Sequence, residues 1–273
     1  MPPLRFLCAA VAQLVERIHG KDEVTGSIPV GGSRVFCECI FCYASGMTQV
    51  KRLPEIDALR GIAVILMVLY HVVVIVDLLG LLEVPLEHWF WVLWARMTQF
   101  LFLGLVGVGV FLSKKGFQGQ LMRGLNVLTA GFVASFATWL VFGADFVRFG
   151  VLHFIGVAIP LVYVFKKGPQ FALVAATLSW TLSEAFGPLL DPIFFSPLDY
   201  FPLFPWLSVP LLGLFIADFV YGDIPGGPQP TSLAVLAKWP ALNWLGNHSL
   251  AIYLLHFPVV YGLAYFIKQV YFL

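Results

Sequence analysis

The sequence predicts an all-helical, polytopic membrane protein with about seven transmembrane helices and a cytoplasmic N-terminus. Three observations predict this fold: the apolar composition, a series of long apolar stretches, and the uneven placement of basic residues between them. Of the 273 residues, 60% are hydrophobic and only 11% are charged, and the mean hydropathy is +0.89. Soluble domains contain about 25% charged residues. The formal net charge of +1 gives no reason to expect nucleic acid as a partner.

The apolar stretches have the lengths that a bilayer requires. A transmembrane helix needs about 20 mostly apolar residues, within a range of roughly 17–25. Pro160, Pro210 and Pro258 fall inside three of the stretches, and membrane helices tolerate proline where neighbouring groups satisfy the freed carbonyl. We predict seven spans, at residues 58–82, 89–112, 124–143, 149–165, 170–190, 203–221 and 247–267.

Basic residues in the loops predict the orientation, because cytoplasmic loops are enriched in Lys and Arg. With the N-terminus inside, the outer side carries Arg148 and Lys268, and the longest inner loop, about 222–246, is a Pro- and Gly-rich flexible connector. We therefore expect a multi-pass protein of the cell membrane, with the lipid bilayer as its first partner. The basic residues on the inner side are Lys51, Arg52, Lys114, Lys115, Arg123, Lys166, Lys167 and Lys238.

The first 46 residues do not fit this pattern. Residues 11–17 and 20–33 resemble the conceptual translation of a transfer-RNA gene, so we expect translation to start at Met47 and residues 1–46 to stand outside the fold. Residues 47–273 are then a single integral membrane domain. All four cysteines precede Met47, which leaves no thiol for a disulfide, a nucleophile or a thiolate metal site in that domain.

Asp57, Arg60 and His71 form the most informative polar pattern. Ionisable groups at membrane depth are costly and usually mark function. At about 100° per residue, Arg60 and His71 lie within about 20° of each other on a helix, and Asp57 lies about 40° to the other side. Burial favours a neutral imidazole at His71, which is the form a general base needs. The alternatives are a structural histidine, an acid near the helix dipole and a snorkelling arginine.

Further polar residues lie in the later spans. Arg96 and Gln99 are three apart in the second span, where an arginine needs a carboxylate, a substrate anion or water. His153 lies at the start of the fourth span, and Tyr253 and His256 share a face of the seventh. The three histidines lie at comparable depth and can share a pocket, or each can form a structural interhelical hydrogen bond.

The stretch before the sixth span, residues 199–206, reads Asp-Tyr-Phe-Pro-Leu-Phe-Pro-Trp. Its prolines make a rigid start to the helix, and its aromatic residues suit the membrane interface. Asp199 is therefore a candidate for contact with a substrate or for a structural role at the start of this helix.

Four motifs together carry a family resemblance. They are Glu-Ile-Asp-Ala-Leu-Arg-Gly-Ile-Ala at 55–63, Phe-Gly-Val-Leu-His-Phe-Ile-Gly at 149–156, the stretch 199–206, and Leu-Gly-Asn-His-Ser-Leu-Ala-Ile-Tyr-Leu-Leu-His-Phe-Pro at 245–258. They resemble the prokaryotic membrane family related to the catalytic domain of heparan-α-glucosaminide N-acetyltransferase. More distantly, the first motif resembles the acyltransferase-3 membrane family, in which the histidine corresponding to His71 is thought to be catalytic.

The resemblance implies a membrane N- or O-acetyltransferase. Its donor would be acetyl-CoA or another acyl-CoA on the cytosolic side, its acceptor a sugar or glycolipid with a free amine or hydroxyl, and no metal is required. On this interpretation the catalytic candidates are His71, His153 and His256. The substrate-binding candidates are Asp57, Arg60, Arg96, Gln99, Asp199 and Tyr253.

Two other functions stay open from the sequence alone. The same histidines and carboxylates suit the proton relay of a transporter or flippase. They also suit a non-catalytic membrane protein in which polar groups only hold helices together.

Overall fold

Proline and glycine mark the ends of most helices in this chain. The computed structural model describes residues 53–195, 198–222 and 231–271. The expected boundary at residue 46 and all four cysteines lie outside the described residues. Pro54, Pro169 and Pro240 each occupy the first turn of a helix, where the missing N–H costs nothing, and Gly143 and Gly168 flank helix ends.

The described residues form helices joined by short turns. The longer ones are α3 (Pro54–Leu78), α4 (Trp89–Leu112), α5 (Phe117–Phe142), α6 (Val151–Val164), α7 (Pro169–Phe194), α9 (Ser208–Tyr221) and α11 (Ser249–Tyr271). The shorter ones are α8 (Leu203–Trp206), α10 (Pro240–Asn247), and the 3₁₀ segments η1 (Gly143–Asp145), η2 (Phe165–Lys167) and η3 (Ser232–Lys238).

The all-helical prediction is confirmed for the described part of the chain, and each predicted span coincides with a helix. Five segments are long and apolar enough to cross a membrane: Pro54–Leu78, Trp89–Leu112, Phe117–Asp145, Leu203–Tyr221 and Ser249–Tyr271. Helix α6 has 14 residues, and α7 is interrupted by polar residues and two internal prolines. The protein is thus a multi-pass membrane protein, and the count of seven spans stays a prediction.

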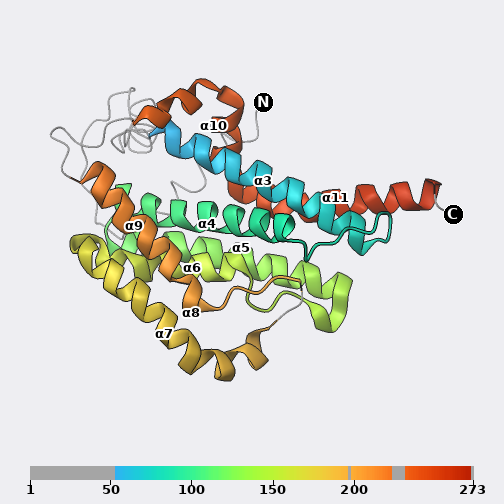
Figure 1. The fold of residues 1–273 in the computed structure, drawn as a ribbon, viewed down its shortest axis with the longest axis horizontal. Coiled ribbons are helices and arrows are strands. Elements are labelled where there is room, and N and C mark those ends of the chain that lie inside the picture. Colours follow the sequence, from blue (N-terminus) through green and yellow to red (C-terminus); the bar gives the residue numbers. More distant parts are fainter. Residues whose placement is uncertain (1–52, 196–197, 223–230, 272–273) are drawn as a thin grey trace, which may run out of the picture. The chain divides into compact units, whose positions relative to one another are not determined.

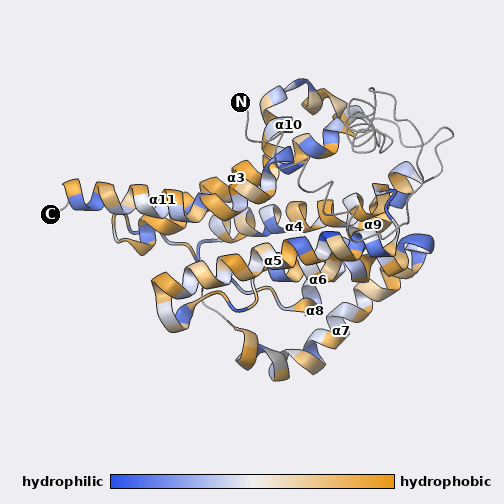
Figure 2. Cartoon of the chain, turned by 180° about the vertical axis from the view of Figure 1, so that it is seen from behind, coloured by the Kyte–Doolittle hydropathy of each residue, from blue (hydrophilic) through white to orange (hydrophobic). Residues whose placement is uncertain are grey.

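Large apolar side chains point outward from several helices. Phe132, Trp180 and Leu255 are all about 60% exposed, with values of 59%, 61% and 60%. Figure 2 shows apolar residues along most of α3, α4 and α11. Such an outer surface is suited to contact with lipid, because exposing it to water would be unfavourable.

Helix α3 lies between α4, α10 and α11, and α4 also packs against α9, as Figure 1 shows. Helix α6 packs mainly against α5, and its residues Phe154, Ala158 and Val162 are fully buried. A helix that is apolar all round is typically buried inside a protein. The core of the described unit therefore lies between α4, α6 and α9.

The prediction of a flexible connector over 222–246 is wrong for its second half. Residues 232–247 form η3 and α10, and α10 packs closely along α3. Two glycines allow this contact: a Cβ on Gly61 would lie 2.2 Å from the carbonyl oxygen of Leu242, and one on Gly246 would lie 1.8 Å from that of Asp57. The second half of the predicted connector is therefore a packed part of the fold.

Candidate functional site

Two of the three candidate histidines meet between α3 and α11. The rings of His71 and His256 lie edge to face, with centroids 4.7 Å apart. His71 is half-buried and His256 is buried. Within the described residues, no three His, Cys, Asp or Glu side chains are grouped as metal ligands usually are.

Local hydrogen bonds fix which nitrogen of each ring carries the proton. His71 Nδ1 lies 2.8 Å from the carbonyl oxygen of Met67, and His256 Nδ1 lies 2.6 Å from that of Tyr253. A carbonyl only accepts, so Nδ1–H donates in both rings and Nε2 of each neutral ring keeps a lone pair. His256 Nε2 is buried without a partner in the described structure. Each ring can thus accept a proton at Nε2.

His153 has a different environment. Its Nδ1 accepts from Gly150 N–H at 3.3 Å, and its Nε2 lies 3.3 Å from Ser135 Oγ, which itself donates to the carbonyl of Val147. Both ring nitrogens therefore have partners: Nδ1 bonds within the N-terminal turn of α6, and Nε2 joins α6 to Ser135 of α5. Gly131 leaves room for the ring, because a Cβ there would lie 3.2 Å from it. This geometry favours a structural role, and a catalytic role for His153 stays a prediction.

Asp199 connects the start of α6 to α11. Its Oδ2 accepts from Val151 N–H at 3.0 Å and from the Tyr253 hydroxyl at 3.4 Å. Gly150 permits this approach, since a Cβ there would lie 2.2 Å from Oδ2. The carboxylate thus occupies the N-terminal end of α6, where the helix dipole favours negative charge. The ring of Tyr253 lies 5.5 Å from that of His256, which brings Asp199 into the same neighbourhood as the histidine pair.

Asp199 gives the protein a testable pH dependence. It lies between α7 and α8, outside the membrane-spanning segments, and burial raises the pKa of its carboxyl from 3.8 to about 6, although the hydrogen bonds from Val151 and Tyr253 lower it. Its contribution to stability is therefore fully present below pH 4 and is lost as the pH rises through about 6.

Between pH 4 and 7, Asp199→Asn is expected to gain stability relative to the unmodified protein. One pKa unit corresponds to about 1.4 kcal/mol, so the difference in the free energy of unfolding between the variant and the unmodified protein changes by up to about 3 kcal/mol across this range. Thermal unfolding in detergent at several pH values measures this stability difference. Asp191→Asn, at a carboxylate that lines the nearby pocket, is the control. A difference that stays constant across this range would contradict the proposed ionisation.

Arg96 and Gln99, which are three residues apart, lie together on α4. Arg96 Nη1 donates to Gln99 Oε1 at 3.1 Å, and the guanidinium lies 5.2 Å from the ring centroid of Trp206. In the described part of the chain no carboxylate forms an ion pair with Arg96. An exposed guanidinium stacked on an aromatic ring remains able to bind an anion or a developing negative charge.

Asp57 and Arg60 form the ion pair that their three-residue spacing suggests, with 3.0 Å between Oδ1 and Nη1. They lie at the start of α3, towards the end of the bundle that holds Lys114, Lys115 and η2. Asp57 is buried and the Arg60 side chain is 28% exposed. The structure thus separates the sequence candidates into a basic end and a histidine site further along α3.

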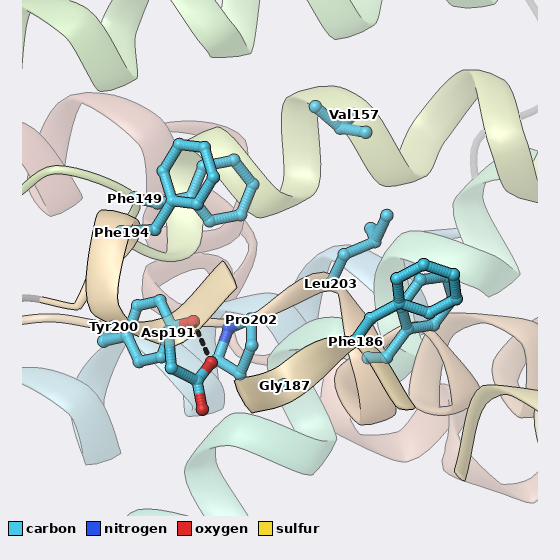
Figure 3. A pocket seen from close by; sticks show the side chains of 10 residues that line it. Phe149, Val157, Phe186, Gly187, Asp191, Phe194, Tyr200, Pro202 and Leu203 are labelled. Carbon is cyan, nitrogen blue, oxygen red and sulfur yellow. Dashed lines mark hydrogen bonds between the residues drawn. The ribbon is translucent and has the colours of Figure 1, made fainter. Parts of the chain in front are cut away.

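An apolar pocket opens near Asp199. Its volume is about 220 Å³, and Figure 3 shows aromatic side chains from the loop before α6, from α7 and from the chain before α8 around it. The Tyr200 hydroxyl donates to Asp191 at its polar side. Phe149 lines the pocket and also contacts the ring of His153, with centroids 5.8 Å apart. The remaining lining residues include Phe186, Phe194, Leu203 and Phe204.

Three polar residues were missed by the sequence reasoning. Glu55 is fully buried and accepts from Tyr221 Oη at 2.8 Å and from Thr231 N–H at 2.9 Å. Gln120 is fully buried with both side-chain polar atoms unpartnered in the described structure. The prediction of Arg123 as a loop residue is wrong, because α5 begins at Phe117 and includes it. An ionisable residue within two turns of an apolar stretch was the available signal for Glu55 and Arg123.

The comparisons with known proteins agree with the motifs. A family model described as heparan-alpha-glucosaminide N-acetyltransferase, catalytic, matches residues 52–258. This range includes the histidine pair, the Asp199 contacts and the basic end. Neither the curated proteins nor the solved structures give a significant match. Because the family model covers most of the chain, the protein belongs to the family of the heparan-α-glucosaminide N-acetyltransferase catalytic domain.

Proposed function

We propose that this protein is a membrane acyltransferase that moves an acetyl group from cytosolic acyl-CoA to an amine or hydroxyl of a sugar or glycolipid at or across the membrane. The observation that carries the proposal is the contact between His71 and His256, in which both Nε2 atoms keep a lone pair, inside a chain of this acetyltransferase family. Acyl transfer to an amine or hydroxyl needs a base of this kind.

The chemistry follows from the free Nε2 atoms. One imidazole takes the proton from the acceptor as its nitrogen or oxygen attacks the thioester carbon, and the resulting imidazolium returns that proton to the departing CoA thiolate. The tetrahedral intermediate carries a negative oxygen, which Arg96 or Gln99 would stabilise. A covalent route, in which Nε2 first accepts the acetyl group, is equally compatible with this arrangement. The contacts of His153 favour His71 and His256 over it as the base.

The two ends of the protein suit the two substrates. Lys114 and Lys115 are exposed at the end that also holds Arg60, and cations there would attract the phosphates of acyl-CoA. With about seven spans and a cytoplasmic N-terminus, this end faces the cytosol. The aromatic pocket near Asp199 lies toward the other end and suits an apolar part of the acceptor. Its lining favours a glycolipid over a free sugar.

Acetyl transfer from labelled acetyl-CoA tests the proposal directly. The purified protein in lipid nanodiscs is incubated with labelled acetyl-CoA, with and without glucosamine-type acceptors presented free or on a lipid. We expect label on the acceptor, and more of it on the lipid-linked form. Absence of both label transfer and acetyl-CoA binding would overturn the proposal.

A second function is supported by one observation. Asp199, Tyr253, His256 and His71 form a series of neighbouring polar groups, which is the arrangement of a proton relay in a transporter or flippase. This function predicts substrate movement coupled to a pH gradient without any need for CoA. Transport into proteoliposomes with and without a pH gradient separates it from acyl transfer, and neither activity would be expected of a non-catalytic protein.

A further inference from the structure

Two arginines from different helices meet beside a glycine at the basic end of the protein. A Cβ on Gly109 of α4 would lie 3.0 Å from Arg60 Nη2 and 3.4 Å from Arg123 Nη2. Both guanidinium groups thus lie against the same point on α4, Arg60 from α3 and Arg123 from α5. The missing side chain at Gly109 leaves room there.

The charge at this point is positive. Arg60 forms an ion pair with Asp57, whereas within the described residues Arg123 makes no hydrogen bond or ion pair and has Arg60 as its charged neighbour. Like charges that lie this close to one glycine repel each other, and the repulsion is stronger where the surroundings are partly apolar. Lys114, Lys115 and Lys166 are further cations at this end, and the Lys166 ammonium donates to the carbonyl of Ser113. Glu55 is an acid in the first turn of α3, but its carboxylate accepts from Tyr221 and Thr231.

We propose that Arg60 and Arg123 bind a phosphate group between them, over Gly109. A dianion there would remove the repulsion between the guanidinium groups, and each planar fork can donate two parallel hydrogen bonds to phosphate oxygens. Arg60 and Arg123 are both partly exposed, so an anion can reach them. The phosphate can belong to a nucleotide or to an anionic lipid headgroup. Only in the first case, with CoA as the carrier, does the inference rest on the proposed function.

Binding measurements on the full chain in nanodiscs test the site. For a nucleotide source, the probe is adenosine 3′,5′-bisphosphate, which is added to the protein in phosphatidylcholine nanodiscs, and calorimetry measures its binding. For a lipid source, the probe is phosphatidic acid, and native mass spectrometry measures how much of this lipid stays bound to the protein. We expect Arg123→Gln to weaken binding of the effective probe by about 10- to 100-fold, as for loss of charged hydrogen bonds, and Arg123→Lys to restore part of it. Arg148→Gln, at the other end of the bundle, is expected to bind as the unmodified protein does.

A second variant changes the space and keeps the charges. Gly109→Leu places a side chain between the guanidinium groups and is expected to weaken binding at least tenfold. Gly104→Leu on the same helix is the matched control, because a Cβ there meets no atom of the described residues within 4 Å. Circular dichroism and thermal unfolding confirm that each variant folds.

Every outcome decides the question. Loss of binding of either probe in Arg123→Gln and Gly109→Leu supports the site and identifies the carrier. Unchanged binding in either folded variant, or no binding of either probe by the unmodified protein, overturns it. Neither probe carries an acetyl group or an acyl thioester, so a protein that binds phosphate but transfers no acetyl group would refute the proposed function and keep this site.

Discussion

Replacing His71 or His256 with alanine is expected to lower kcat/KM for acetyl transfer by about 10²- to 10⁴-fold, the usual contribution of a general base. The expectation follows from Nε2, which keeps a lone pair in both neutral rings because Nδ1 donates to a backbone carbonyl. If the two imidazoles share one proton, the double variant should lose little more than the worse single variant, because residues that act as a unit are not additive. Rates with labelled acetyl-CoA measure the effect.

His248 provides a matched control for these variants. Its Nδ1 also lies 2.8 Å from the carbonyl of the residue four positions earlier, Trp244, but the ring is exposed. His248→Ala removes the same local hydrogen bond without touching the histidine pair and should keep full activity. If folded His71→Ala and His256→Ala proteins also keep it, then neither ring is the base, and His153 becomes the remaining histidine candidate.

The fold was largely predictable because membrane helices are limited by bilayer thickness and backbone hydrogen bonding. The apolar stretches located every helix from α3 to α7, α9 and α11. The fourth stretch shows the limit of this approach. Helix α6 is apolar because protein surrounds it, with Phe154 and Ala158 fully buried, and hydropathy alone does not distinguish such burial from contact with lipid.

The candidate site was predictable only where residues are neighbours on one helix. The Asp57–Arg60 and Arg96–Gln99 pairs follow from three-residue spacing. The contact between His71 and His256 depends on how α3 packs against α11, which no pattern in a single sequence specifies. The loop prediction for Arg123 is wrong for a related reason: hydropathy locates only the apolar part of a helix, and α5 begins six residues before Arg123.

Alanine at Gly107 is expected to cost stability, by about 2–3 kcal/mol or more. A Cβ there would lie 1.9 Å from the carbonyl oxygen of Pro210 and 2.7 Å from the amide nitrogen of Leu214. Both atoms belong to the backbone of α9, so a side-chain rotation cannot relieve the clash, and α4 and α9 must separate. A Cβ on Gly213 would likewise lie 2.2 Å from the carbonyl oxygen of Gly104. Small residues on both helices thus permit a close approach of the kind that stabilises helix pairs in membranes.

The same helix offers a control with the opposite expected sign. In the described part of the chain, a Cβ on Gly104 meets nothing within 4 Å, and alanine is a better helix former than glycine by about 1 kcal/mol. Gly104→Ala should therefore raise the thermal midpoint slightly or leave it unchanged, whereas Gly107→Ala should lower it by several degrees. Both are single-methyl changes on one helix in the same detergent, so effects on helix propensity and on detergent binding largely cancel. Equal midpoints for the two variants would mean that α4 and α9 do not touch at Gly107, and the core between α4, α6 and α9 would need another arrangement.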